Sequence, residues 1–122
     1  MNPIAALAGV RAVVGASAWL APNFSGRLFG LDPDNNPQGA YLARLFGIRD
    51  LALAVGTQNS EGEARKLWLQ AGVLCDAADG AAALLAGRNG TLPKVSTVLT
   101  AGAAIAAIGL GAMALQEPAP AT

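Results

Sequence analysis

The final apolar segment constrains the fold most, because the chain contains no charged residue from Val95 to Gln116. At a helical rise of about 1.5 Å per residue, this run extends about 33 Å, enough to cross the ~30 Å hydrocarbon core of a bilayer. A helix of a soluble bundle needs a polar stripe facing water. This run offers only Ser96, Thr97, Thr100 and Gln116 for that purpose. We therefore expect a transmembrane helix here.

Three further apolar segments also have the length and composition of helices. The first begins with Asn2-Pro3, an N-cap residue followed by proline at the first helical position. The residues around Arg27 mix apolar and polar side chains, which is typical either of a short interfacial helix near 24–30 or of a loop with a hydrophobic anchor. The four long helices are predicted over residues 3–21, 38–57, 63–86 and 93–116.

These segments together predict an all-α fold, an integral membrane four-helix bundle with up-down topology. Residues 1–116 are expected to form one domain, with 117–122 as a disordered tail. Hydrophobic residues make up 53% of the chain and charged residues only 13%, whereas soluble domains carry roughly 25% charged residues. The sequence thus predicts a multi-pass protein of a bacterial cell membrane, with the lipid bilayer as its main partner.

Composition also argues against several functions. The formal net charge is zero and there is no basic patch, so we expect no nucleic-acid partner. Histidine, the commonest general base and metal ligand, is absent, and Cys75 is the single cysteine. We therefore predict neither a metal site nor a cofactor.

Charged residues within the predicted helices are the main exception to their apolar character. Arg49 and Asp50 lie at the middle of the second predicted helix, Arg11 at the middle of the first, and Asp76 and Asp79 near the middle of the third. On insertion scales a central Arg or Asp costs ~2.5–3.5 kcal/mol, whereas each large apolar residue returns only ~0.3–0.6 kcal/mol. The second helix should therefore need partners for its charges within the bundle or from another subunit.

The spacing of these charges suggests how they pair. Asp76 and Asp79 are three residues apart, so both should face one side of their helix. Arg49 and Asp50 are about 100° apart and should reach different neighbours. We expect Arg49 or Arg11 to pair with the two aspartates of the third helix, and Asp50 to pair with the remaining arginine. The predicted ionic layer comprises Arg11, Arg49, Asp50, Asp76, Asp79 and, nearer the lipid headgroups, Arg44.

Small residues on the same helices should let the helix backbones approach closely. Several share a face with the charged residues, and three on the last helix form a ladder with a spacing of four. The predicted packing positions are Gly9, Gly15, Gly47, Gly72, Gly80, Ala103, Ala107 and Gly111.

Two short stretches carry a resemblance to a known family. These are Arg44-Leu-Phe-Gly47-Ile-Arg49-Asp50-Leu on the second helix and Cys75-Asp76-x-x-Asp79-Gly80 on the third. Together they resemble an uncharacterised family of small bacterial and fungal membrane proteins with four predicted spans. The resemblance implies the fold and the membrane location. It implies no activity, substrate or catalytic residue.

The sequence leaves three functions open. The first is a structural or interaction role, in which the ionic layer locks the helices together. The protein would then pack as a subunit, through the small-residue ladder of the last helix, with a second copy or another membrane protein. The second is an oligomeric small-solute or proton-coupled transporter with a hydrated ionic layer. The third is a membrane enzyme acting on a lipid or isoprenoid, with Asp76 and Asp79 as acid and base and Arg49 binding an anionic group. Without histidine, or a nucleophile beside a base, we expect a non-enzymatic role.

Overall fold

The computed structural model describes residues 2–117, and all regular secondary structure in this range is helical. This confirms the all-α class. Each end of the four long helices lies within two residues of its predicted position, and the short helix after the first long one is also present. The elements are α1 (Pro3–Leu20), α2 (Pro22–Leu28), the 3₁₀ turn η1 (Pro33–Asn35), α3 (Gly39–Gln58), α4 (Gly62–Arg88) and α5 (Lys94–Leu115).

Local sequence explains where these helices begin and end. The Asn2 side chain accepts a hydrogen bond from the backbone N–H of Ile4 at 2.9 Å, with Pro3 at the first helical position, as predicted. After α4, Gly90 adopts a φ of 76°, a left-handed conformation that glycine takes without strain. The predicted disordered tail, apart from Glu117, lies outside the described residues.

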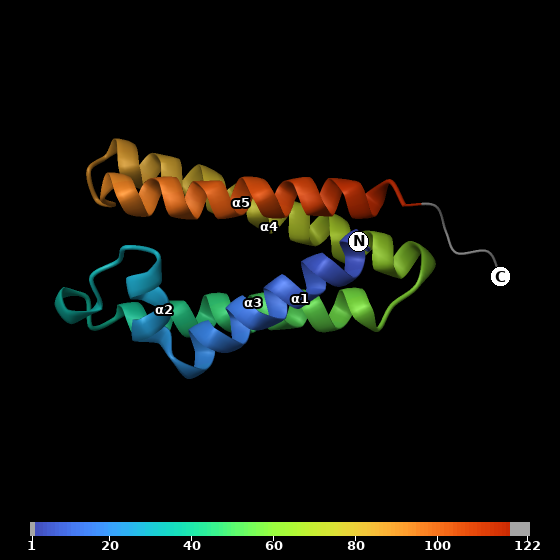
Figure 1. The fold of residues 1–122 in the computed structure, drawn as a ribbon, viewed down its shortest axis with the longest axis horizontal. Helices are drawn as coiled ribbons and strands as arrows, with labels where there is room; N and C mark the ends of the chain where they lie inside the picture. The colour runs from blue at the N-terminus through green and yellow to red at the C-terminus, as the bar shows by residue number, and fades with distance from the viewer. Residues whose placement is uncertain (1, 118–122) are drawn as a thin grey trace.

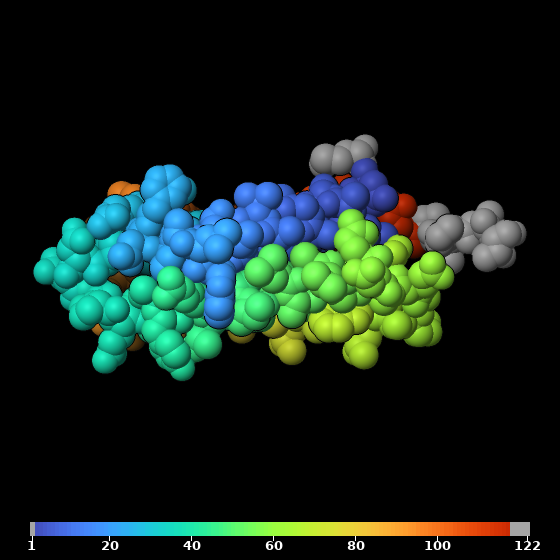
Figure 2. Space-filling view, turned by 90° about the horizontal axis from the view of Figure 1, so that it is seen from below, coloured from blue at the N-terminus to red at the C-terminus, as the bar shows by residue number. Residues whose placement is uncertain are grey.

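The four long helices run alternately up and down as two pairs (Figure 1). α1 packs along α3, and α4 packs along α5. The contacts between the two pairs, α1 with α5 and α3 with α4, are less extensive. Seen from below, α1 and α3 lie side by side along most of the molecule (Figure 2). The tight pairs thus leave a looser boundary between them.

Glycine allows a close backbone contact between α1 and α3. A Cβ atom added to Gly15 would lie 2.6 Å from the Gly47 carbonyl oxygen, and one added to Gly47 would lie 2.6 Å from the Gly15 carbonyl oxygen. The backbones of α1 and α3 therefore touch, as predicted for these two positions. In the other pair, a Cβ atom on Gly80 would lie 3.4 Å from the Ala104 side chain.

Two of the predicted packing positions do not contact another helix closely within residues 2–117. An added Cβ on Gly9 would meet nothing within 4 Å in the described part of the chain, so Gly9 faces outward. In the α5 ladder, Gly111 is buried against Val73 and Ala107 is half-buried, but Ala103 is exposed. The reason is geometric: each step of four residues advances about 40° beyond a full helical turn. A row with this spacing drifts from the packed face of α5 to its outer face.

The bundle places small residues inside and large apolar residues outside. Its buried hydrophobic residues are mostly alanine, whereas Val13, Leu74 and Val98 are among many exposed large apolar side chains. A soluble monomer rarely exposes large apolar patches, and membrane helices favour small residues at their contacts. Three helices, α1, α4 and α5, are long and apolar enough to cross a membrane.

The second predicted span, now α3, is not among these three helices. Its 20 residues include Arg44, Arg49 and Asp50, which lower its apolar character. Because α3 packs directly against α1 and α4, its charges have neighbours within the bundle.

Candidate functional site

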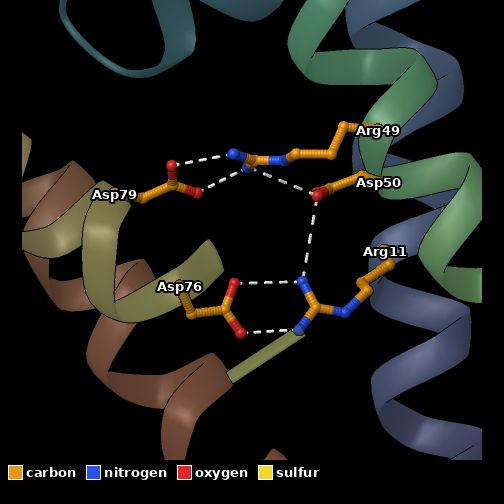
Figure 3. Close-up of polar contacts among 5 residues, drawn as sticks. All are labelled: Arg11, Arg49, Asp50, Asp76 and Asp79. Carbon is orange, nitrogen blue, oxygen red and sulfur yellow. Dashed lines mark hydrogen bonds and ion pairs between the residues drawn. The ribbon is translucent and has the colours of Figure 1, made fainter. Parts of the chain in front are cut away.

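Five charged side chains meet at the boundary between the two helix pairs (Figure 3). We call this set the ionic cluster. It contains two guanidinium groups and three carboxylates, a formal charge of −1. Its members come from α1, α3 and α4, each from the middle part of its helix: Arg11, Arg49, Asp50, Asp76 and Asp79.

Arg11 and Asp76 form the buried centre of the cluster. Arg11 Nη1 donates to Asp76 Oδ1 at 3.0 Å, and Nη2 donates to Oδ2 at 2.6 Å. Both side chains are only 6% exposed. Gly72 makes room for this contact, because a Cβ atom there would lie 2.8 Å from Arg11 Nη2. Such a bidentate, charge-assisted pair is among the strongest polar contacts in proteins, and here it joins α1 to α4.

Arg49 and Asp79 form a second bidentate pair, between α3 and α4. Arg49 Nη1 and Nη2 donate to the two Asp79 carboxylate oxygens at 2.9 and 2.5 Å. This pair lies nearer the surface, with 32% of the Arg49 side chain and 34% of the Asp79 side chain exposed. The Arg49 guanidinium also lies over the Phe46 ring, 4.6 Å from its centroid, a cation–π contact.

Asp50 links the two pairs through longer ionic contacts. Its Oδ1 lies 3.8 Å from Arg11 Nη1 and 3.6 Å from Arg49 Nη2, both beyond ordinary hydrogen-bond distance. This oxygen is buried and has no hydrogen-bond partner within residues 2–117. Asp50 therefore contributes negative charge that the two bidentate pairs do not already match.

The pairing differs from the prediction in two respects. Asp76 and Asp79 do not share one arginine, because they point from α4 to different helices: Asp76 toward α1 and Asp79 toward α3. Arg49 and Asp50 approach each other at the ends of their side chains despite leaving the helix in different directions.

Arg44 is not part of the cluster, contrary to the prediction. Its exposed side chain donates through Nε to the Trp19 carbonyl oxygen at 3.0 Å. Trp19 lies in the last turn of α1, where backbone carbonyls lack intrahelical donors. Arg44 is also about 7.5 Å along α3 from Arg49, too far to join the same polar layer. It fastens the end of α1 to α3 instead.

Two further side chains near the helix contacts have no clear signal in the sequence. Phe46 lies under the Arg49 guanidinium. This contact depends on the position of the Arg49 side chain, so Phe46 alone gives no signal of it. Ser96 is fully buried at the start of α5, and its hydroxyl has no hydrogen-bond partner among the residues described. In the sequence it is simply one of the few hydroxyl residues of α5, and only the fold reveals its burial.

The two aspartates of α4 use their carboxylate oxygens for contacts within the cluster. No group of three potential metal-binding side chains occurs in the described residues. Both oxygens of Asp76 and of Asp79 already accept hydrogen bonds from arginine. A shallow apolar hollow over α5 is lined by Lys94, Val95, Val98 and Leu99 and includes none of the cluster residues. The arrangement is that of paired charges joining helices.

These observations define a class: an all-helical protein with three helices able to cross a membrane and a buried network of salt bridges. Comparison with family models, curated proteins and solved structures finds no match to this chain. The resemblance to small four-span membrane proteins stays a prediction.

Proposed function

We propose that this chain is an integral membrane protein in which α1, α3, α4 and α5 all span the bilayer, with a structural or interaction role. The buried Arg11–Asp76 pair is the observation that carries the proposal. It links the α1–α3 pair to the α4–α5 pair across their looser boundary. In this proposal the ionic cluster is the lock that sets which helices assemble.

Energetics explain why α3 would need this lock. Its central Arg49 and Asp50 together cost ~5–7 kcal/mol on insertion scales, more than its apolar residues recover. Asp79 offsets the cost by pairing with Arg49, and Arg11 lies beside Asp50. α3 would therefore enter the bilayer only together with α1 and α4, which are long and apolar enough to cross it.

The short helix α2 supports the membrane location. Phe24 and Leu28 are exposed on α2, while Arg27 pairs with Asp34 at the surface at 3.0 Å. Exposed apolar side chains beside a solvated ion pair fit a segment lying at the lipid–water interface. In Figure 1, α2 lies at the end of the bundle opposite the start of α1 and the end of α5, as expected for an interfacial helix.

The proposal is tested by comparing Arg11→Gln with Arg27→Gln. Each variant removes a guanidinium from a pair with an aspartate, but Arg11–Asp76 is buried and Arg27–Asp34 is exposed. Wild type should stay in the membrane fraction after alkaline carbonate washing. Thermal unfolding in detergent, followed by circular dichroism, should show marked destabilisation of Arg11→Gln and little change in Arg27→Gln, since exposed ion pairs contribute only ~0–1 kcal/mol. Release of wild type by carbonate would refute the membrane assignment, and equal stability of the two variants would refute the lock.

Proton-coupled transport is a second candidate, favoured by Asp50. This carboxylate is buried and has no hydrogen bond to Oδ1 from the described residues. Intramembrane carboxylates of this kind occur in proton relays. If Asp50 relays protons, liposomes that contain the Asp50→Asn protein should lose proton flux. Asp34→Asn, a change at the surface, is the control and should keep it. Unchanged flux in folded Asp50→Asn protein would exclude this role for Asp50.

The third function considered, a lipid-modifying enzyme, gains no support from the geometry. An acid–base pair needs carboxylate oxygens that can reach a substrate. Those of Asp76 and Asp79 are held by Arg11 and Arg49 in bidentate contacts.

A further inference from the structure

The Arg49–Asp79 pair is unusually exposed for its position along the helices. Both residues lie in the middle part of helices that we propose to span the bilayer. The neighbouring Arg11–Asp76 pair is almost fully buried, whereas about a third of each side chain of the Arg49–Asp79 pair is uncovered. A polar surface at the centre of a bilayer normally faces the interior of a bundle or a cavity, not lipid.

Arg49 cannot remove its charge from the bilayer centre by extending to the headgroups. Both of its terminal nitrogens are bound to Asp79, and its guanidinium lies over Phe46. The headgroup region is ~15 Å from the bilayer centre, and extension toward it would break all these contacts. The exposed part of the pair therefore needs a covering partner at the same depth.

We propose that a second copy of this chain covers the outer face formed by α3 and α4, so that the protein is a symmetric dimer in the membrane. The inference rests on the proposed membrane insertion. Arg49 and Asp79 carry opposite charges on adjacent helices, and such a surface is complementary to itself under a two-fold rotation. The rotation places the guanidinium of each copy near the Asp79 carboxylate of the other, at the same depth.

The surroundings of the pair also suit a close helix contact. Ala52, one turn from Arg49, and Ala82, one turn from Asp79, are both exposed. Small residues at such positions let helices from two membrane proteins approach each other. Covering this face would also remove from lipid the outer side of α3, the one long helix not apolar enough to qualify as a span.

The small-residue ladder of α5 is a weaker candidate for the contact between copies. Gly111 is already in contact with Val73 of α4, and Ala107 packs against the bundle's own hydrophobic core. Ala103 alone is exposed. It therefore provides a matched control position, an exposed alanine near the middle of a different helix.

Site-specific cross-linking tests the proposal. Single cysteines replace Ala52 or Ala103 in a Cys75→Ala background, and each protein is reconstituted into liposomes and treated with a short bismaleimide. The Ala52→Cys protein should give a cross-linked dimer whose yield persists as lipid is added. The Ala103→Cys protein should give only a background that falls on dilution, because random collisions depend on concentration.

Other outcomes overturn the dimer. Equal yields at the two positions would mean random collision, and a dimer at position 103 alone would place the contact on α5. Absence of dimer at position 52 would also refute the proposal. Carbonate washing of the same liposomes distinguishes the two proposals, because protein that stays membrane-bound but does not cross-link refutes the dimer and leaves the membrane assignment intact.

Discussion

The charge balance of the ionic cluster predicts an order of stability for three neutralising variants. The cluster has three carboxylates and two guanidinium groups. Arg11→Gln leaves Asp76 without its bidentate partner and makes the formal charge −2. Asp76→Asn also breaks this pair, but it makes the formal charge zero and leaves Arg11 beside Asp50, 3.8 Å away. Removing the arginine should therefore be the more damaging change.

Magnitudes follow from the contacts that each variant leaves behind. Leaving a buried charge uncompensated costs ~3–5 kcal/mol, which is the loss expected for Arg11→Gln. Asp76→Asn gives up the ion pair but leaves no excess charge, so a loss of ~1–3 kcal/mol is expected. Asp50→Asn removes the charge that neither bidentate pair matches and keeps both pairs. Its stability should be close to that of wild type or above it, because a neutral amide largely avoids the cost of burying a charged carboxylate.

Reversible unfolding in mixed micelles, followed by far-UV circular dichroism, measures these differences. Arg27→Gln, at the exposed pair with Asp34, is the control for loss of a guanidinium. The expected order of destabilisation is Arg11→Gln, then Asp76→Asn, then Asp50→Asn. If Asp50→Asn lowers stability as much as Arg11→Gln, charge balance does not govern the cluster and the reasoning fails.

Two further predictions concern packing, and the same unfolding measurement tests both. Gly47→Ala should lose ~1–3 kcal/mol, because its Cβ atom would lie 2.6 Å from the Gly15 carbonyl oxygen. Gly9→Ala is the control: its Cβ atom meets no described residue within 4 Å, so a gain of up to ~1 kcal/mol is expected from helix propensity. Equal changes in stability for Gly47→Ala and Gly9→Ala would contradict the close α1–α3 contact. Ser96→Ala should be neutral or stabilising, because the buried hydroxyl has no hydrogen-bond partner in the described range. A loss above about 1 kcal/mol would reveal a partner for that hydroxyl.

The positions of the helices could be predicted from the sequence because local signals fix them. Asn2-Pro3 starts α1, and the turn around Gly90 separates α4 from α5. The residues that form the ionic cluster were predictable for a similar reason, since charges in the middle of apolar helices need polar partners. Arg44 was the exception, because its contact with Trp19 depends on where α1 ends beside α3.

The pairing within the cluster could not be predicted, because it depends on how the helices are arranged in space. Asp76 and Asp79 lie about 60° apart around α4, and that angle is enough to direct them toward different helices. Likewise, the sequence spacing of Ala103 and Gly111 does not reveal that one is exposed and the other buried. Such differences depend on the direction in which α5 crosses α4.

Buried charges offer this bundle something that its apolar surfaces cannot. In lipid, where we propose that the protein lies, there is no hydrophobic driving force between helices. The α1–α3 and α4–α5 pairs could then meet in several orientations at similar free energy. Arg11 reaches Asp76 only when the middle of α4 lies near the middle of α1, and Arg49 reaches Asp79 only when α4 also lies beside α3. An orientation that breaks either contact leaves charge unpaired inside the bundle and costs several kcal/mol. The cluster therefore favours one arrangement by penalising the others, even if an apolar replacement of every member would leave the bundle equally stable.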